Sequence, residues 1–375
     1  MERTKLKNLA KQIRGVSYKP EDLHDSLDDD SVILLRANNI DEGKINFDDI
    51  VYVDKSKVSD EQYLKIGDVL ICASSGSKQL VGKAASVDFD SPCTFGAFCK
   101  VVRPNNDVAD YLGKYFQSGV YRRKISEVAI GANINNIRNE HIASLELPVY
   151  EAEQAQMIVE KIGLLQNIID NRKCELSKLD ELIKARFVEM FGDPKANDKG
   201  FTKAPMGEYM TVLTDFSSNG SYKTLDNGVT MYDEPNYAWM VRTTDLESGD
   251  MSSIKYIDEN AYELLSKSKI YGGEIIMNKI GSAGKVYLMP EIEMPASLGR
   301  NAFMFRYDDR INVRFLFEQL VSEYGQAEIQ QYVRGAVTKT ITKDDARSVQ
   351  IIVPEKELQD KYVEFVHQID KSKVV

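Results

Sequence analysis

EAEQAQMIVEKIGLLQNIIDNRKCELSKLDELIKARFVEMF, residues 151–191, is the stretch that decides the fold of this chain. It holds no proline, and Gly163 is its one interior turn signal. Its apolar residues recur in alternating steps of three and four, which is typical of a coiled-coil seam rather than of the broader apolar face of a globular helix. The seam residues are Ile158, Ile162, Leu165, Ile169, Leu176, Leu179, Ile183 and Met190.

A helix over this stretch would be about 60 Å long at about 1.5 Å per residue. Such a helix does not fit inside one compact domain, so it needs a partner helix along its seam. Two seam positions, Arg172 and Arg186, are charged. We therefore interpret residues 151–191 as a spacer helix.

The segments before and after the spacer resemble two copies of one domain. Ser17-Tyr18-Lys19 recurs as Ser221-Tyr222-Lys223, and residues 131–137 recur as residues 335–341, both at an offset of 204 positions. Residues 35–43 and 67–71 recur at 241–249 and 273–277, at an offset of 206. The order of the matches is the same in both copies, which indicates a repeat.

The repeat predicts an α+β fold with two β-rich domains joined by a long coiled-coil helix, against which a second, shorter C-terminal helix pairs. The expected bounds are 1–150 for the first domain, 151–191 for the spacer, 192–200 for a polar linker, 201–353 for the second domain and 354–375 for the C-terminal helix.

The offset of 204 places residues 355–375 opposite residues 151–171, so residues 172–191 have no counterpart in the second copy. We expect Leu176, Leu179, Ile183 and Met190 to lack a partner within the chain. An exposed apolar stripe of that kind favours association. A partner protein, a second copy or a segment missing from the chain would each cover it.

Short apolar runs bounded by Gly, Asp and Asn predict strands at 32–35, 51–53, 69–72 and 98–102, followed by a helix over 111–129. The second copy predicts strands near 238–241, 274–278, 285–289 and 302–305, then a helix over 313–333.

Composition limits the cellular setting and the class of partner. No apolar run reaches the length of a membrane helix, the N-terminus has no signal-peptide core, and the four cysteines have no paired spacing. We expect a reduced, cytoplasmic protein without membrane contact. The net charge of −10 argues against nucleic-acid binding, but the acidic residues cluster, as at Asp28–Asp30, and leave locally basic stretches such as Arg122–Lys124.

Several stretches imitate catalytic motifs and fail on spacing. Residues 281–285 end in Gly-Lys but lack the four-residue gap of a phosphate-binding loop, and Val286 stands where Ser or Thr must bind the metal. Residues 233–237 lack the second proline and the amide of a methyltransferase Asn-Pro-Pro-Tyr loop. None of the three histidines has a partner at triad or metal-ligand spacing. We expect no catalytic residue, no metal and no cofactor in this chain.

Polar loops recur at matched places in both copies, around 74–78 and 279–285 and around 133–138 and 337–343. Their Asn, Ser, Thr, Lys and Arg side chains are able to read base edges and hold phosphates, although the same residues also serve as ordinary turn residues and solvated charges. The candidate DNA-binding residues are Arg36, Ser75, Ser77, Lys78, Arg122, Arg123, Asn133, Asn135, Asn136, Arg138, Tyr222, Lys223, Arg242, Lys279, Ser282, Lys285, Lys339, Thr340 and Lys343.

This combination resembles the specificity subunit, HsdS, of type I restriction-modification systems. The resemblance covers essentially the whole chain and is carried by GANINNIRNEHI at 131–142, by Leu147-Pro148 and by RFVEMFGDP at 186–194. Tyr150 departs from the family pattern, which usually has a second proline there, and residues 337–341 match more loosely.

The resemblance implies that each globular domain is a target recognition domain for double-stranded DNA and that the chain is not an enzyme by itself. It also implies that methyltransferase subunits (HsdM) and restriction and translocation subunits (HsdR) assemble on the chain, and that S-adenosylmethionine, ATP and Mg²⁺ bind only to those partners. Two different readers on one spacer would recognise a bipartite, asymmetric target.

Three alternatives stay open at this stage. The chain could serve a related two-subunit or methylation-only modification system. It could be a protein-binding scaffold without DNA affinity, which salt-dependent duplex binding would distinguish. It could be an enzyme acting unaided, such as a fused methyltransferase or a nuclease; a cofactor turn with an Asn-Pro-Pro-Tyr loop would have favoured that class, and neither is present.

Overall fold

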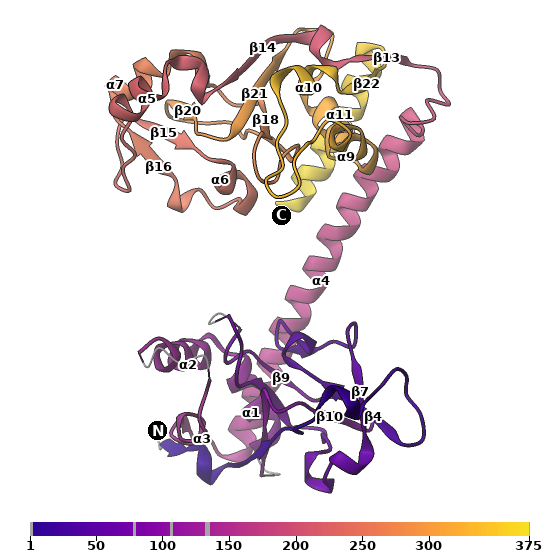
Figure 1. Cartoon of the computed structure of the whole chain (residues 1–375), viewed down its shortest axis with the longest axis vertical. Coiled ribbons are helices and arrows are strands. Elements are labelled where there is room, and N and C mark those ends of the chain that lie inside the picture. Colours follow the sequence, from indigo (N-terminus) through magenta and orange to yellow (C-terminus); the bar gives the residue numbers. More distant parts are fainter. Residues whose placement is uncertain (1–2, 78–79, 106–107, 132–135, 375) are drawn as a thin grey trace. The chain divides into compact units, whose positions relative to one another are not determined.

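The computed structural model describes residues 3–77, 80–105, 108–131 and 136–374. The chain divides into two compact units, unit 1 (Met1–Arg172) and unit 2 (Lys173–Val375). The long helix α4 (Ala152–Phe191) therefore contributes its first half to unit 1 and its second half to unit 2 (Figure 1). Its bounds agree with the predicted spacer to within one residue.

Unit 1 is built around strand β8 (Val69–Cys72), all four residues of which are buried. Successive side chains of a strand point to opposite faces. Val69 and Ile71 accordingly pack in one core with α1 (Ala109–Gln117) and α2 (Gly119–Gly131), whereas Leu70 and Cys72 pack in a second core with the other sheet. This double burial explains why the sequence there is a continuous apolar run.

Two four-stranded sheets make up most of unit 1. The first is antiparallel, in the order β2-β11-β8-β9, and the second has the order β10-β4-β7-β3, in which β10 and β4 are parallel. Unit 1 also contains β1, β5, β6, β12 and α3. Bounds are β1 Arg3–Lys5, β2 Ala10–Arg14, β3 Leu23–His24, β4 Ser31–Leu35, β5 Ile40–Asp41, β6 Lys44–Ile45, β7 Val51–Asp54, β9 Ala84–Ser86, β10 Cys93–Phe95, β11 Cys99–Pro104, β12 Glu146–Pro148 and α3 Asn139–Ala143.

Unit 2 repeats this plan. Its sheet β14-β21-β18-β19 has the order and antiparallel pairing of β2-β11-β8-β9, and β15 and β20 are parallel as β4 and β10 are. One edge differs, because β17 lies beside β20 whereas β3 lies beside β7. Bounds are β13 Thr202–Pro205, β14 Met210–Asp215, β15 Ala238–Val241, β16 Lys255–Ile257, β17 Lys269–Ile270, β18 Ile275–Asn278, β19 Val286–Leu288, β20 Ala296–Leu298, β21 Ala302–Tyr307, β22 Gln350–Val353, α5 Tyr222–Gly228, α6 Thr243–Ser248, α7 Glu259–Leu264, α8 Val313–Val321, α9 Glu323–Gln330, α10 Lys343–Ser348 and α11 Lys356–Lys373.

The predicted α+β class and the repeat are confirmed, but each predicted long helix after the sheets is in fact a pair of helices. Ser118 separates α1 from α2, and Ser322, 204 positions later, separates α8 from α9. Each serine hydroxyl donates back to a carbonyl three residues earlier, at 2.6 Å in both units, and accepts the N–H of the residue three positions later. A serine that competes for backbone groups in this way ends one helix and caps the next.

The C-terminal helix α11 packs along the end of α4 within unit 2 (Figure 1). Phe191 lies 4.8 Å from Phe315 and 5.5 Å from Tyr362 between ring centroids, and Phe187 lies 5.5 Å from Tyr362. Lys373, at the far end of α11, pairs with Asp180 at 2.7 Å, so the two helices run antiparallel. The cluster therefore fixes the end of α4 from Ile183 to Phe191.

This packing predicts a large loss of stability when Phe191 is truncated. Phe191 is fully buried, so Phe191→Ala should cost unit 2 about 3–5 kcal/mol. The measurement is urea unfolding followed by the fluorescence of Trp239, the single tryptophan of the chain, which lies in unit 2. Val188→Ala, on the same helix but 59% exposed, is the control and should change the midpoint little. Equal shifts in the two variants would contradict the assigned packing.

Candidate nucleic-acid interface

The structure brings the two matched polar loops of each copy side by side. In unit 1, Ser74 forms an antiparallel bridge with Asn136, and the N–H of Ile137 donates to the carbonyl of Ala73 at 2.7 Å. In unit 2, Ile280 bridges Thr340 in the same way. A buried isoleucine, Ile137 or Ile341, follows the bridged residue and anchors each pair of loops. Each unit therefore has, at the same place, a pair of bridged loops, which we call the loop edge.

Lys78, Asn133 and Asn135 lie outside the described residues. Of the other unit 1 candidates in these loops, Ser77 donates its N–H to the hydroxyl of Ser75 at 3.2 Å, and Ser77 and Asn136 are exposed. Arg138 is exposed and stands at the N-cap of α3, where its N–H donates to Nδ1 of His141.

Two neighbouring arginines on α2 have different environments. Arg123 is exposed. Arg122 is half-buried and donates from Nη1 to the carbonyl of Val81 at 2.6 Å. Arg122 therefore holds the turn at Gly82 in place, whereas Arg123 is presented to solvent.

In unit 2, two candidate lysines share one carboxylate. Lys279 and Lys343 contact the two oxygens of Asp215 at 2.8 and 2.9 Å, and the Asp215 side chain is only 6% exposed. Burial raises the pKa of Asp215, but hydrogen bonds from Lys279, Ser217, Ser218 and Lys343 outweigh burial and hold that pKa well below its ordinary value of 3.8. The carboxylate therefore stays ionised and positions both lysines beside the loop edge.

Lys285 has its own acidic partner. Its ammonium group pairs with Glu247 and lies 5.8 Å from the ring centroid of Tyr287. The hydrogen bond between Lys285 and Glu247 raises the pKa of the lysine and lowers that of the glutamate. Ser282 and Lys339 are exposed in the same loop pair, and the carbonyl of Lys339 accepts the N–H of Gly281 at 2.9 Å.

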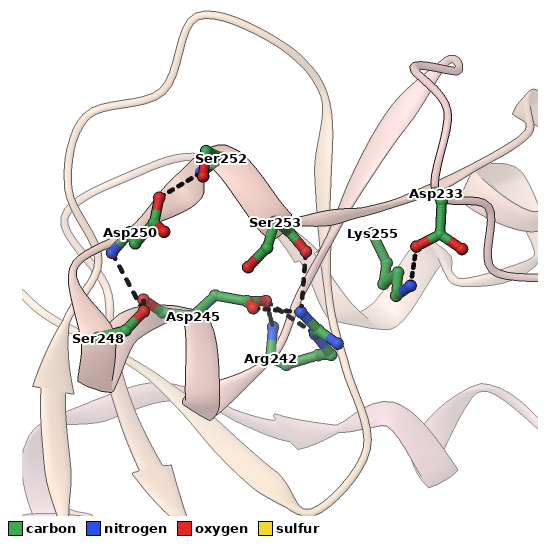
Figure 2. Close-up of polar contacts among 8 residues, drawn as sticks. All are labelled: Asp233, Arg242, Asp245, Ser248, Asp250, Ser252, Ser253 and Lys255. Carbon is green, nitrogen blue, oxygen red and sulfur yellow. Dashed lines mark hydrogen bonds and ion pairs between the residues drawn. The ribbon is translucent and has the colours of Figure 1, made fainter. Parts of the chain in front are cut away.

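Arg36 and Arg242 occupy equivalent positions and bind within their own units. Arg36 donates to Asp49 at 2.9 Å. Arg242 binds both carboxylate oxygens of Asp245, which is 2% exposed, and also the carbonyl of Ser253 at 3.1 Å (Figure 2). The hydrogen bond to Asp245 raises the pKa of Arg242. Both arginines therefore stabilise the turn that follows a sheet strand.

Tyr222 and Lys223 lie at the start of α5, where Ser221 caps the helix by accepting the N–H of Thr224. Tyr222 is 75% exposed, and Lys223 is exposed. Two neighbours of this tyrosine, Arg300 and Asn301, were missed by the sequence reasoning. The available signal was the polar pair that follows Gly299 between two apolar strands.

The seam of α4 differs from the sequence expectation. Ile183 is buried and Met190 packs against the same aromatic cluster, so the expectation that both lack a partner within the chain is wrong. Leu176 and Leu179 are half-buried. The exposed part of the seam lies earlier, where Ile162, Leu165 and Ile169 are 39%, 60% and 49% exposed and Ile158 is half-buried.

The repeat explains why the exposed part of the seam lies in unit 1. At the offset of 204, Ile162 and Leu165 correspond to Val366 and Ile369 of α11, which are covered by the end of α4. In unit 1 the same positions carry exposed apolar side chains.

Within the described part of the chain, no group of three or more His, Cys, Asp or Glu side chains is arranged to hold a metal ion. None of the described helices is both long and apolar enough to cross a membrane.

The fold and the paired loop edges define a protein built from two copies of one α+β domain. Residues 209–374 match the family model described as the type I restriction modification DNA specificity domain. The chain is similar to the specificity subunits of type I restriction-modification systems, as the sequence predicts.

Two relatives carry this similarity. The chain is 30% identical over 279 residues to the EcoKI specificity subunit of Escherichia coli K12, covering 71% of this chain and 58% of that protein. It is 38% identical over 173 residues to the StySPI specificity subunit of Salmonella potsdam, covering 46% of this chain and 37% of that protein. The chain thus spans between about a third and three fifths of the length of these relatives.

Two solved structures share the fold. The S subunit of a type I system from M. genitalium superposes with a TM-score of 0.53 at 13% identity, covering 99% of this chain and 90% of that one. A chain from a study of complex assembly and conformational transition of the type I R-M system superposes with a TM-score of 0.52 at 16% identity, covering 100% of this chain and 90% of that one.

The lysine pair on Asp215 predicts a pH-dependent stability difference. Because the folded-state pKa of Asp215 is depressed, its contribution is present above the ordinary value of 3.8 and is lost as pH falls below it. Asp215→Asn should cost about 2 kcal/mol at pH 7, and the difference from wild type should narrow below about pH 4.

Urea unfolding of unit 2 at pH 7, 5 and 3.5, followed by Trp239 fluorescence, measures this difference. Asp309→Asn, an exposed aspartate in the turn after β21, is the control and should change stability little at any of these pH values. A constant difference between wild type and Asp215→Asn across the series would contradict the assigned role.

Proposed function

We propose that this chain is the DNA-reading subunit of a type I restriction-modification enzyme. Each unit reads one half of a bipartite, asymmetric duplex target, and α4 sets the unread gap between the halves. The chain supplies no catalytic group. Methylation and cleavage are performed by the methyltransferase and restriction subunits that assemble on it, which also bind S-adenosylmethionine, ATP and Mg²⁺.

The observation that carries this proposal is the matched loop edge. The bridges Ser74–Asn136 and Ile280–Thr340 place the same kind of edge on both units, while the side chains differ at equivalent positions, as at Asn136 and Thr340. A constant backbone with variable hydrogen-bonding groups is what two readers of different half-sites require, because side-chain chemistry distinguishes base edges.

Phosphate contacts give this proposal its first test. Arg123→Ala and Arg138→Ala should each weaken binding to all duplexes alike and reduce the slope of log binding constant against log salt by about 0.9 per lost phosphate contact. Lys279→Ala and Lys343→Ala should change the slope less, because Asp215 already offsets part of their charge.

Fluorescence anisotropy with labelled duplexes at several salt concentrations measures the slope. Lys55→Ala, an exposed lysine whose Nζ donates to the carbonyl of Asp29, is the control and should leave the slope unchanged. Duplex binding without salt dependence, or no binding, would favour a protein-binding scaffold instead.

We also propose that the exposed seam of α4 in unit 1 is where the methyltransferase subunit docks. The equivalent surface of α11 is covered by a helix in unit 2, so a helical segment with an apolar seam fits the exposed positions. Burial of Leu165 and Ile169 would contribute about 1.5–3 kcal/mol each.

Leu165→Glu with Ile169→Glu should therefore abolish co-purification with the methyltransferase subunit while leaving the unfolding of the chain unchanged. Leu182→Glu, at a 45% exposed leucine on the unit 2 part of α4, is the matched control and should still co-purify. If light scattering shows a wild-type dimer that the double variant converts to monomer, a second copy occupies the stripe and the methyltransferase assignment fails.

A further inference from the structure

Two adjoining pockets of unit 2 lie next to the loop edge and meet at one arginine. The larger has a volume of about 490 Å³ and the smaller about 180 Å³, and both are lined by Phe216, Arg300 and Asn301. Ile280 and Ser282, from the loop that bridges Thr340, line the larger pocket, and Tyr222 lines the smaller one. The pockets therefore continue the loop edge that the proposed function assigns to DNA.

The turn between β20 and β21 presents Arg300 at this point. Gly299 donates its N–H to the carbonyl of Val241 at 2.7 Å, and a Cβ at Gly299 would lie 2.8 Å from that oxygen, so the close approach requires glycine. Asn301 follows with φ +69°. These constraints fix the backbone on both sides of Arg300.

Aromatic rings hold the guanidinium group of Arg300. Its Cζ lies 5.1 Å from the ring centroid of Phe216, which is buried, and 5.8 Å from that of Tyr222. Its ion pair is with Asp226, whose side chain is 54% exposed, at 3.3 Å. A guanidinium that stacks on rings keeps its planar N–H edge available for hydrogen bonding.

Arg242, in the same pocket, provides a contrast. It binds both oxygens of the buried Asp245 and a backbone carbonyl, so its hydrogen-bonding edge is used within the protein (Figure 2). Of these two arginines, Arg300 is the one whose position is fixed by stacking rather than by a buried acid.

Unit 1 contains the same turn with different side chains. Gly96 donates to the carbonyl of Leu35 at 2.9 Å, as Gly299 does to that of Val241. The next two residues are Ala97 and Phe98, and Phe98 is 72% exposed. The two turns thus share this hydrogen bond, although a Cβ at Gly96 would lie 3.9 Å from the Leu35 oxygen. They differ in the residues that they expose, as expected of a position that determines sequence preference.

We propose that Arg300 is a base-reading residue of unit 2 and that it recognises a guanine in the half-site read by that unit. An arginine that donates two hydrogen bonds to O6 and N7 of guanine is the commonest specific contact in the major groove. This inference rests on the proposed function, because it assumes that the unit 2 loop edge faces DNA.

Selection of bound sequences from a randomised duplex library tests the inference, with the full-length chain used alone and in complex with its methyltransferase subunit. Arg300→Ala should remove the preference for guanine at one position in one half of the selected motif and leave the other half unchanged. Affinity for the best wild-type sequence should fall roughly ten- to hundredfold. Arg300→Lys should keep the salt dependence of wild type yet lose the same preference, because lysine lacks the planar fork.

Arg310→Ala is the matched control. Arg310 also stacks on a tyrosine, 4.5 Å from the Tyr209 ring centroid, and pairs with an aspartate, but it follows the opposite end of β21. Its variant should select the wild-type motif.

The outcomes separate the two proposals. If wild type selects a motif and Arg300→Ala selects the same motif, the base-reading role of Arg300 is overturned and the proposed function stands. Uniform weakening across all sequences, with lysine restoring binding, identifies a phosphate contact and also overturns base reading. If wild type selects no motif either alone or in complex with the methyltransferase subunit, the proposed function is overturned, and this inference with it.

Discussion

The packing of Phe187 and Phe191 against Phe315 and Tyr362 is the interaction on which the rest of unit 2 depends. A helix as long as α4 gains little stability from its own hydrogen bonds and needs tertiary contacts along an apolar face. The aromatic cluster supplies those contacts from α8 and α11, which lie more than a hundred residues further along the chain. Because Tyr362 is fully buried and its hydroxyl donates to the carbonyl of Ile183 at 3.4 Å, the contact also sets the register of the two helices.

The two units share backbone devices and differ in what those devices expose. Ser118 and Ser322 break the helices in the same way, β8 and β18 separate two cores in the same way, and Gly96 and Gly299 donate equivalent turn hydrogen bonds. All of these depend on burial, capping or backbone hydrogen bonding, which tolerate few substitutions. The exposed residues beside them carry no such constraint. A scaffold of this kind allows sequence preference to change without loss of the fold.

The charged residues of unit 2 likewise include buried groups that fix positions and exposed groups that they hold. Asp215 holds two lysines, Glu247 holds Lys285, and Asp245 holds Arg242, so several cations that look available in the sequence are already paired. Pairing lowers the positive potential but fixes where each charge lies. The net charge of −10 is therefore a poor guide to the local surface, because acidic residues beside the loop edge position cations there as well as cancelling them.

The sequence by itself determined the features that arise from local patterns. The seam spacing predicted α4, the repeat predicted two units of one plan, and apolar runs located the strands, because periodicity and turn chemistry act over a few residues. Only the tertiary structure decided that α11 covers Ile183 and Met190, that Asp215 binds lysines 64 and 128 positions away, and that Arg300 stacks between Phe216 and Tyr222. Each of these contacts joins residues that are distant in sequence, and no short-range pattern encodes which distant side chains will meet.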